Sequence, residues 1–389
     1  MYSFELQPSV HFGAGAAALA GNLLHSEGIS RVLVVCDPAM IKLGLFEPVK
    51  ESLGAVNIDY RIFSKVNPNP LDSDAEYVAD SVRSFSPQAI IAQGGGSAID
   101  FAKAISILLV NPAPLIEYEG KNRVPLAGPP VMAVPTTAGT SSEITCVIAM
   151  LSKAESRKYV VCGRNVGAHW ALVDPSMTWN LPAHVTAATG ADALTHVIES
   201  YTSRLATPLT KYHALKSAEI IVKNLPIAVL DGEDKIARED MMLACVLAGF
   251  SFSNAELGSV HGIAHVLSAR FGTAHGEANA ALLPYVMCYN MEEKSVACAY
   301  RELGEAMGTV PQGLSDEDGA RETIKSIYEL CKTINLPSLR DLIGEQAKLS
   351  TIADDSLSEA AHDFNPRQPV TRSALLKILN AAYNEILLL

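Results

Sequence analysis

The sequence has 389 residues, of which 49% are hydrophobic and 19% charged, a balance typical of a globular protein large enough for two domains. The formal net charge is −12 and the lysines and arginines are scattered, so we expect neither nucleic acid nor an anionic membrane as a partner. The seven cysteines form no CxxC pair and the N-terminus lacks the features of a signal peptide, which predicts a cytoplasmic protein with reduced thiols.

The first half of the chain alternates short apolar runs with segments of helical length. Helices are expected, for example, at Asp72–Phe85 and Ala98–Leu109. Such alternation predicts βαβ units and a parallel sheet, hence a Rossmann-like α/β domain whose apolar strands are covered on both faces. The expected strands are Val32–Cys36, Ile58–Phe63, Ala89–Ala92, Val131–Val134, Cys146–Met150, Tyr159–Cys162 and Ala171–Val173.

The second half is dominated by alanine, leucine, glutamate and lysine at helical spacing, and we expect no strand there. The composition changes around the prolines between Asp174 and Pro182, which place a domain boundary near residue 182. The chain is therefore divided into an α/β domain over 1–182 and an all-α helical bundle over 183–389. Helices are expected, among others, at Tyr212–Val222, Arg238–Phe250, Glu292–Met307 and Arg372–Leu388.

A glycine run, Gly94-Gly95-Gly96-Ser97, follows one expected strand directly and precedes an expected helix. Glycines at such a turn let the backbone approach a pyrophosphate, and the helix N-terminus offers N–H groups and a positive dipole end. The run is not a GxGxxG fingerprint, so a tight turn that simply needs glycine is an equal alternative. A second glycine pair, Gly13 and Gly15, has no expected strand before it and is interpreted as structural.

Two more polar segments follow expected strands. Asp37 can accept from a ribose hydroxyl and would repel a 2′-phosphate, which favours NAD over NADP, unless Asp37-Pro38 is merely a turn or a helix start. The hydroxyl-rich run from Thr136 to Glu143 suits phosphate and amide contacts, or it caps a following helix. Three polar strand ends in one sheet favour a ligand, because ligands bind at the carboxyl ends of parallel strands.

Asp192 and His196 are four residues apart in GADALTHVIESY, so they share one helical face that looks either into solvent or into a polar cavity. His261 and His265 have the same spacing in an apolar segment, and His275 follows soon after. Gly262 stands where an HExxH protease would carry its glutamate, which argues against peptide hydrolysis. A carboxylate with imidazoles suits iron(II) or zinc, and satisfied core histidines are the alternative.

Together the motifs resemble those of the iron-containing (group III) alcohol dehydrogenase family over nearly the whole chain. The most specific are GGGSAIDFAK (94–103), PTTAGTSSE (135–143), LPAHVTAATGADALTHVIESY (181–201), VHGIAHVLSARFGTAHGEANAALLP (260–284) and NPR (365–367). The resemblance implies a dehydroquinate synthase-like architecture with a cleft between the two domains. It also implies catalysis of NAD-dependent hydride transfer between a small primary alcohol and its aldehyde, with a metal as Lewis acid.

The resemblance further implies the roles of individual residues. Asp192, His196, His261 and His275 would bind Fe²⁺, or Zn²⁺, while His265 would lie beside nicotinamide and substrate and help to relay a proton. Phe252 and the neighbourhood of Ala361 would lie near the substrate. Besides Gly94 and Gly95 of the glycine run, the positions expected to line NAD are Asp37, Asn69, Gly96, Ser97, Asp100, Thr136, Thr137, Thr140, Thr145, Lys158 and Leu181.

Three other functions compete with this one. The first is a zinc- and NAD-dependent enzyme of similar architecture, resembling either glycerol dehydrogenase, a polyol dehydrogenase, or dehydroquinate synthase. A non-redox metal hydrolase would use the metal ligands without NAD, and a non-catalytic scaffold would only bind metal. The resemblance also suggests a homodimer or a larger homo-oligomer.

Overall fold

The computed structural model describes residues 2–155 and 157–389. The chain divides into two compact units, Leu6–Trp179 and Asn180–Leu389, the second of which also includes the described N-terminal residues 2–5. The first unit contains a sheet with the strand order β1-β9-β6-β4-β2-β3, in which every neighbouring pair is parallel. These strands are β1 (Ser9–Phe12), β2 (Arg31–Cys36), β3 (Asp59–Phe63), β4 (Ala89–Gly94), β6 (Val131–Pro135) and β9 (Trp170–Val173).

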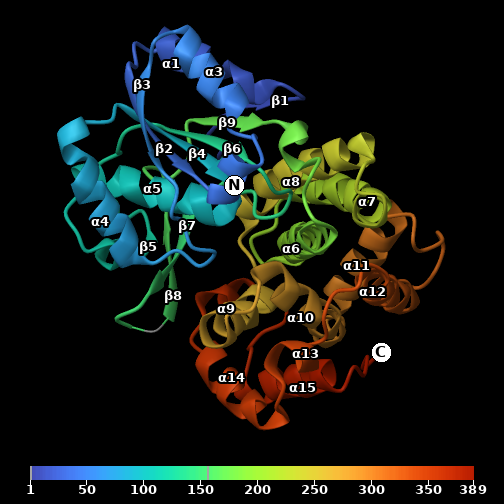
Figure 1. Cartoon of the computed structure of the whole chain (residues 1–389). Coiled ribbons are helices and arrows are strands. Elements are labelled where there is room, and N and C mark those ends of the chain that lie inside the picture. The colour runs from blue at the N-terminus through green and yellow to red at the C-terminus, as the bar shows by residue number, and fades with distance from the viewer. Residues whose placement is uncertain (1, 156) are drawn as a thin grey trace. The chain divides into compact units, whose positions relative to one another are not determined.

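The central strands of this sheet bury both of their faces. Along β2, Leu33 and Val35 belong to one hydrophobic cluster, and the alternate residues Val32 and Val34 belong to another. The first cluster includes residues of α4 (Asp72–Val82) and α5 (Gly96–Val110), and the second includes residues of α1 (Ala20–Ser26) and α3 (Glu47–Ala55). Helices therefore cover both faces of the sheet, as Figure 1 shows and as the continuous apolar strands predict.

Two of the expected strands do not join this parallel sheet. β7 (Val147–Ser152) and β8 (Arg157–Cys162) pair antiparallel, and with β5 (Gly120–Lys121) they form a separate three-stranded sheet. Buried and half-buried residues alternate along β7, so this strand lacks the continuous burial of the parallel core strands. Both runs form strands as expected, but they lie outside the parallel sheet that the alternation predicts.

The short strand β1 also escapes sequence reasoning, because SVHF is neither long nor uniformly apolar. It ends directly before Gly13, so the expectation that no strand precedes Gly13 and Gly15 is wrong. The interpretation that these two glycines serve the fold rather than a ligand is supported, since the backbone N–H of Gly15 donates to the buried Asp174 carboxylate. The remaining helical segments of this unit are α2 (Pro38–Lys42) and the 3₁₀ helices Ala16–Leu19, Arg83–Phe85, Leu115–Tyr118 and Pro175–Thr178.

The second unit is helical, and no strand occurs between residues 183 and 389, all of which have a described backbone. Its core helix α6 packs against α7, α8 and α10. The helices are α6 (Ala183–Thr202), α7 (Pro208–Leu230), α8 (Lys235–Ala255), α9 (Ser259–Phe271), α10 (His275–Asn290), α11 (Lys294–Ala306), α12 (Asp316–Thr333), α13 (Leu339–Ile343), α14 (Leu349–Ser356) and α15 (Arg372–Tyr383), with 3₁₀ turns at Gln346–Lys348 and Ala360–Phe364.

Helix ends differ from the expected ranges for local reasons. α7 starts earlier than predicted, because Thr207 and Thr210 form a reciprocal capping box at its N-terminus. α15 stops at Tyr383, because Glu385 adopts a positive φ and Ile386 bonds back to the carbonyl of Ala381. Among the described residues no single helix is long and apolar enough to cross a membrane, and α8 with α9 pass that test only as a pair bent by 103°.

Candidate metal centre and cofactor edge

Asp192 and His196 project from α6 into the interior of the helical unit. Only 2% of Asp192 and 4% of His196 is exposed, because α6 is surrounded by α7, α8 and α10. The alternative that this helical face looks into solvent is therefore wrong. A buried carboxylate four residues from a buried imidazole requires partners of opposite charge or hydrogen-bonding character.

Two other helices supply the remaining imidazoles. His261 lies in the first turn of α9 and is 2% exposed, whereas His275 is the first residue of α10 and is partly exposed. The next residue, Gly276, allows α10 to approach α6 closely, since a Cβ at that position would lie 2.0 Å from the carbonyl oxygen of Ala188. A glycine is required at this contact, because any larger residue would push the start of α10 away from Asp192.

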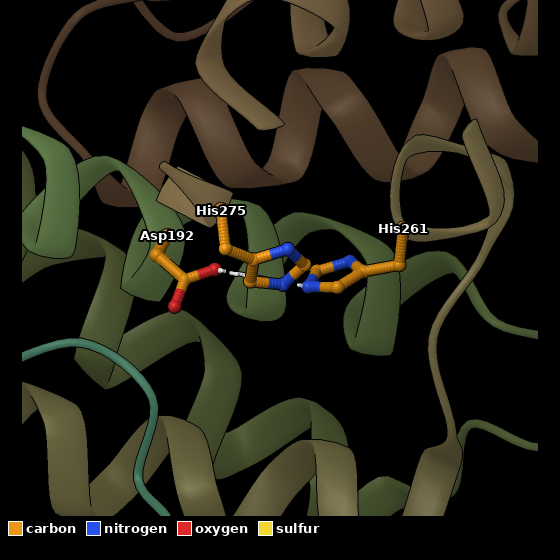
Figure 2. Close-up of side chains that lie close together, drawn as sticks. All are labelled: Asp192, His261 and His275. Atoms are coloured by element: carbon orange, nitrogen blue, oxygen red, sulfur yellow. Dashed lines mark ion pairs between the residues drawn. The ribbon is translucent and has the colours of Figure 1, made fainter. Parts of the chain in front are cut away.

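The four side chains converge on one carboxylate oxygen. The distances from Asp192 Oδ1 are 3.7 Å to His196 Nε2, 3.8 Å to His261 Nε2 and 3.7 Å to His275 Nε2. One ligand-type atom from each of Asp192, His261 and His275 lies within 4.8 Å of the others, and Figure 2 shows these three side chains facing one another. Three imidazole nitrogens and a carboxylate oxygen form a donor set that suits iron(II) or zinc.

Asn279 lies among the same atoms and is fully buried. Its Nδ2 lies 2.7 Å from Asp192 Oδ1, 3.2 Å from His261 Nε2 and 3.3 Å from His275 Nε2. Its Oδ1 has no hydrogen-bond partner among the described residues. The NH₂ group of Asn279 therefore lies where the acceptor atoms of Asp192, His261 and His275 converge, and its unpaired Oδ1 lies beside them. Acceptor atoms that converge on one point fit a cation there.

The charges of the cluster favour a cation as well. Burial alone would raise the pKa of Asp192, but His196, His275 and His261 hold that pKa well below its usual range. Burial alone would lower the pKa of His261, but hydrogen bonds to Asp192 and Glu199 raise it to about 9. The site stabilises positive charge, so protons and a metal ion compete for it.

The other residues expected near the reaction lie around this cluster. The ring of His265 stacks on that of His275 with 5.6 Å between centroids, and its Nδ1 lies 3.2 Å from Glu359 Oε2. Phe252 stacks on His196 at 4.2 Å. The 3₁₀ turn that contains Ala361 packs on α9, where the ring of His362 fills the space that a Cβ on Gly262 would need. Gly262 therefore serves packing.

In the α/β unit, the three polar strand ends come together as the sequence predicts. They follow the neighbouring strands β2, β4 and β6. The backbone N–H of Thr136 donates to the carbonyl of Gly94. A Cβ on Gly95 would touch the side chain of Thr137, and a Cβ on Gly96 would touch that of Thr140. A Cβ on Gly94, which has a φ of +156°, would lie 3.5 Å from that of Asp37. α5 begins at Gly96 and includes Ser97 in its first turn.

Asp37, the hydroxyl-rich run and Gly94 each have a structural role at this edge of the sheet. Asp37 does start a helix, since its carboxylate caps α2 by accepting from Ala39 N, and the ribose contact stays a prediction. The run from Thr136 to Glu143 caps no helix, because irregular chain leads from it to β7, so the helix-cap interpretation is wrong. The positive φ of Gly94 gives the glycine run a conformational role whether or not a phosphate binds there.

The remaining expected cofactor residues have different surroundings. Asp100 is buried and accepts from Ser142 Oγ and Ala149 N, so it holds the loop that contains Thr145, whose carbonyl accepts from Lys103. Asn69 lies just before Leu71, which bridges to Leu151 of β7, and Lys158 is the residue of β8 paired with Leu151. Leu181 belongs to the helical unit, where its carbonyl accepts from Arg238. The structure thus leaves these NAD contacts as predictions.

Comparison with known proteins decides the family. The model described as iron-containing alcohol dehydrogenase matches residues 7–175, and the model of the C-terminal part of the Fe-containing alcohol dehydrogenase family matches residues 186–383. The chain belongs to the iron-containing alcohol dehydrogenase family. It is therefore an oxidoreductase that acts on alcohols or aldehydes, as the sequence resemblance implies.

Other members of the family match over nearly their full length. Alcohol dehydrogenase 4 of Saccharomyces cerevisiae is 36% identical over 381 residues, which cover 98% of each chain. NAD-dependent methanol dehydrogenase of Bacillus methanolicus is 32% identical and covers 98% of this chain and 100% of its own. The crystal structure of a 1,3-propanediol oxidoreductase superposes with a TM-score of 0.93 at 34% identity, covering 98% of this chain and 100% of that one.

Sequence reasoning missed three polar residues that contact the candidate centre of this iron-type alcohol dehydrogenase. Glu199 and Asn279 touch expected ligands, and Glu359 touches His265. Helical spacing could have revealed two of them, because Glu199 is seven residues after Asp192 and Asn279 is four after His275. Glu359 comes from a distant segment and carries no local signal.

Proposed function

We propose that this iron-type alcohol dehydrogenase uses NAD and Fe²⁺ to interconvert a small primary alcohol and its aldehyde. The observation that carries the metal assignment is the position of three imidazole Nε2 atoms within 3.7–3.8 Å of one buried oxygen of Asp192. Asp192, His196, His261 and His275 would hold the ion. When bound, the metal would act as a Lewis acid toward the substrate oxygen.

The chain's own residues would prepare the reaction in three ways. Glu359 would accept a hydrogen bond from Nδ1 of His265, at 3.2 Å, so that Nε2 of His265 is the atom able to accept or release a proton. Phe252, stacked on His196, would provide an apolar wall that limits water beside the ligands. The half-buried position of His265, with an 18% exposed side chain, suits a group that exchanges protons with substrate or solvent.

The NAD assignment rests on the carboxyl edge of the parallel sheet. The N-terminus of α5, at Gly95 and Gly96, offers backbone N–H groups and a positive dipole end to a pyrophosphate, beside the hydroxyls of Thr137 and Thr140. The carboxylate of Asp37 would accept from a ribose hydroxyl and disfavour the 2′-phosphate of NADP. One of the matched relatives is named as NAD-dependent, which supports the same cofactor here.

The test is anaerobic reconstitution of the metal-free protein with Fe(II) or Zn(II), followed by reduction of small aldehydes with NADH and with NADPH. The panel includes acetaldehyde, 3-hydroxypropionaldehyde, lactaldehyde and sulfoacetaldehyde. We expect activity with Fe(II) and NADH to exceed that with Zn(II) or NADPH. Higher activity with zinc would favour the zinc alternative, and no NAD binding by calorimetry in the metallated protein would refute the cofactor assignment.

We also propose a cytoplasmic location, which is supported by seven cysteines that form no disulfide in the described structure. The homodimeric or larger assembly stays a prediction that sedimentation equilibrium would test.

A further inference from the structure

Glu199 is a buried carboxylate at the back of the candidate metal centre, with 6% of the residue exposed. It follows Asp192 and His196 on α6 at spacings of seven and three residues, which place all three on one side of that helix. Its Oε2 lies 2.6 Å from Nδ1 of His261, and its Oε1 accepts from the backbone N–H of Val260 at 2.7 Å.

The contact with His261 determines which ring nitrogen carries a proton. An ionised carboxylate only accepts hydrogen bonds, so Nδ1 of His261 must be the donor. A neutral imidazole then has its lone pair on Nε2, the atom that lies 3.8 Å from Asp192 Oδ1. The side-chain nitrogen of Asn279, 3.2 Å from the same Nε2, is consistent with a lone pair there.

The contact with Val260 fixes the position of the ligand as well. Oε1 of Glu199 caps the N-terminus of α9, one residue before His261, and so joins the two helices that carry three of the proposed ligands. Gly258 permits this approach, since a Cβ there would lie 2.9 Å from the same Oε1. Asn365 caps the neighbouring N–H of Ser259, so the start of α9 is held by two buried side chains.

We propose that Glu199 is a positioning residue of the metal centre, which holds His261 in the Nδ1–H tautomer and aims its Nε2 at the ion. This inference rests on the proposed ligand set. Carboxylates in this outer position orient the imidazole and increase its basicity, and their loss weakens metal binding about 10–100-fold. Glu199 of α6 and His261 of α9 would thus form a carboxylate–histidine–metal arrangement in which the carboxylate orients the ligand.

The substitution Glu199→Gln tests the proposal. A glutamine oxygen can accept from Val260 N or from His261 Nδ1, but not from both with the same geometry as the carboxylate. If the oxygen faces Val260, the amide NH₂ faces Nδ1 and selects the tautomer whose Nε2 carries the proton. We expect metal dissociation constants for Fe(II) and Zn(II), measured by chelator competition, to rise about 10–100-fold.

The matched control is Glu359→Gln, which alters the half-buried contact between Glu359 and His265 without touching a proposed ligand. Its metal affinity should stay within about twofold of the wild type, well below the effect expected for Glu199. Nitrogen-15 spectra of the zinc-loaded protein should show Nδ1–H for His261 in the wild type and in Glu359→Gln. Denaturation of each metal-free variant separates lost stability from lost metal affinity.

Two results separate the inference from the function on which it rests. Wild-type metal affinity in Glu199→Gln, with metal binding abolished by His261→Ala, would overturn the role of Glu199 but leave the ligand set intact. Metal binding unaffected by His261→Ala would instead refute the ligand set. If Glu199→Gln does not fold, Glu199→Asp serves as the second variant, since its shorter carboxylate cannot keep the 2.6 Å contact and should also weaken binding.

Discussion

Replacing Gly276 with alanine should damage the metal centre although the residue bears no ligand atom. The added Cβ would lie 2.0 Å from the Ala188 carbonyl oxygen and 3.3 Å from the Asp192 Cβ. The first distance falls about 1 Å short of the 3.0 Å below which Cβ contacts essentially never occur. Because the obstacle is backbone rather than a flexible side chain, α6 or the start of α10 must move.

The size of this movement determines the expected loss. Overpacking of this kind costs about 1–3 kcal/mol of folding free energy. Ligand groups must be held within about 0.5 Å of their working geometry, so a shift of about 1 Å between His275 and Asp192 should weaken metal binding at least about tenfold. Both effects should appear together in Gly276→Ala.

The assays are urea unfolding of the metal-free protein and metal affinity by chelator competition. Gly54→Ala is the matched control, because Gly54 lies near the end of α3 with no atom within 4 Å of the added Cβ. That variant should keep wild-type metal affinity and gain about 0.4–1 kcal/mol of stability. Wild-type unfolding and metal affinity in Gly276→Ala would refute the reasoning.

Two further predictions concern the α/β unit. Burial raises the pKa of Glu143 from 4.5 to about 7, so the free energy of unfolding falls as pH rises between these values. Glu143→Gln should remove that loss. At pH 8 its free energy of unfolding, measured with urea, should exceed that of the wild type by about 3 kcal/mol, with little difference at pH 4.5. A pH-independent gain would contradict this assignment. Asp37→Asn should keep the cap on α2 yet remove the negative charge. The ratio of kcat/KM with NADP to kcat/KM with NAD should then rise about tenfold, corresponding to about 1.4 kcal/mol. An unchanged ratio would mean that Asp37 does not discriminate between NAD and NADP.

Much of the fold could be predicted because burial leaves a local pattern in the sequence. The strand around Val32–Cys36 is apolar on both faces and, as expected, lies inside the parallel sheet, between β4 and β3. The pairing of β7 with β8 could not be predicted in the same way, because the choice of a partner strand depends on contacts across the chain. Short apolar runs show that a strand forms, but not which sheet it joins.

The candidate site also combines features that local spacing predicts with features that depend on tertiary contacts. The spacing of Asp192 and His196 placed them on one helical face, but only tertiary packing shows that this face is buried. The convergence of α6, α9 and α10 depends on the absence of a Cβ at Gly276, which in the sequence is only one glycine among 26. Glu359 reaches His265 across 94 positions of the chain, a contact that no local spacing encodes.

The central claim is the ligand set, and metal stoichiometry after anaerobic reconstitution with Fe(II) tests it most directly. Wild-type protein and His184→Ala, which alters an exposed histidine on the same helix α6, should each retain one iron per chain after desalting. His261→Ala and His275→Ala should retain almost none while remaining folded by circular dichroism. Full iron occupancy in either of these two variants would contradict the account.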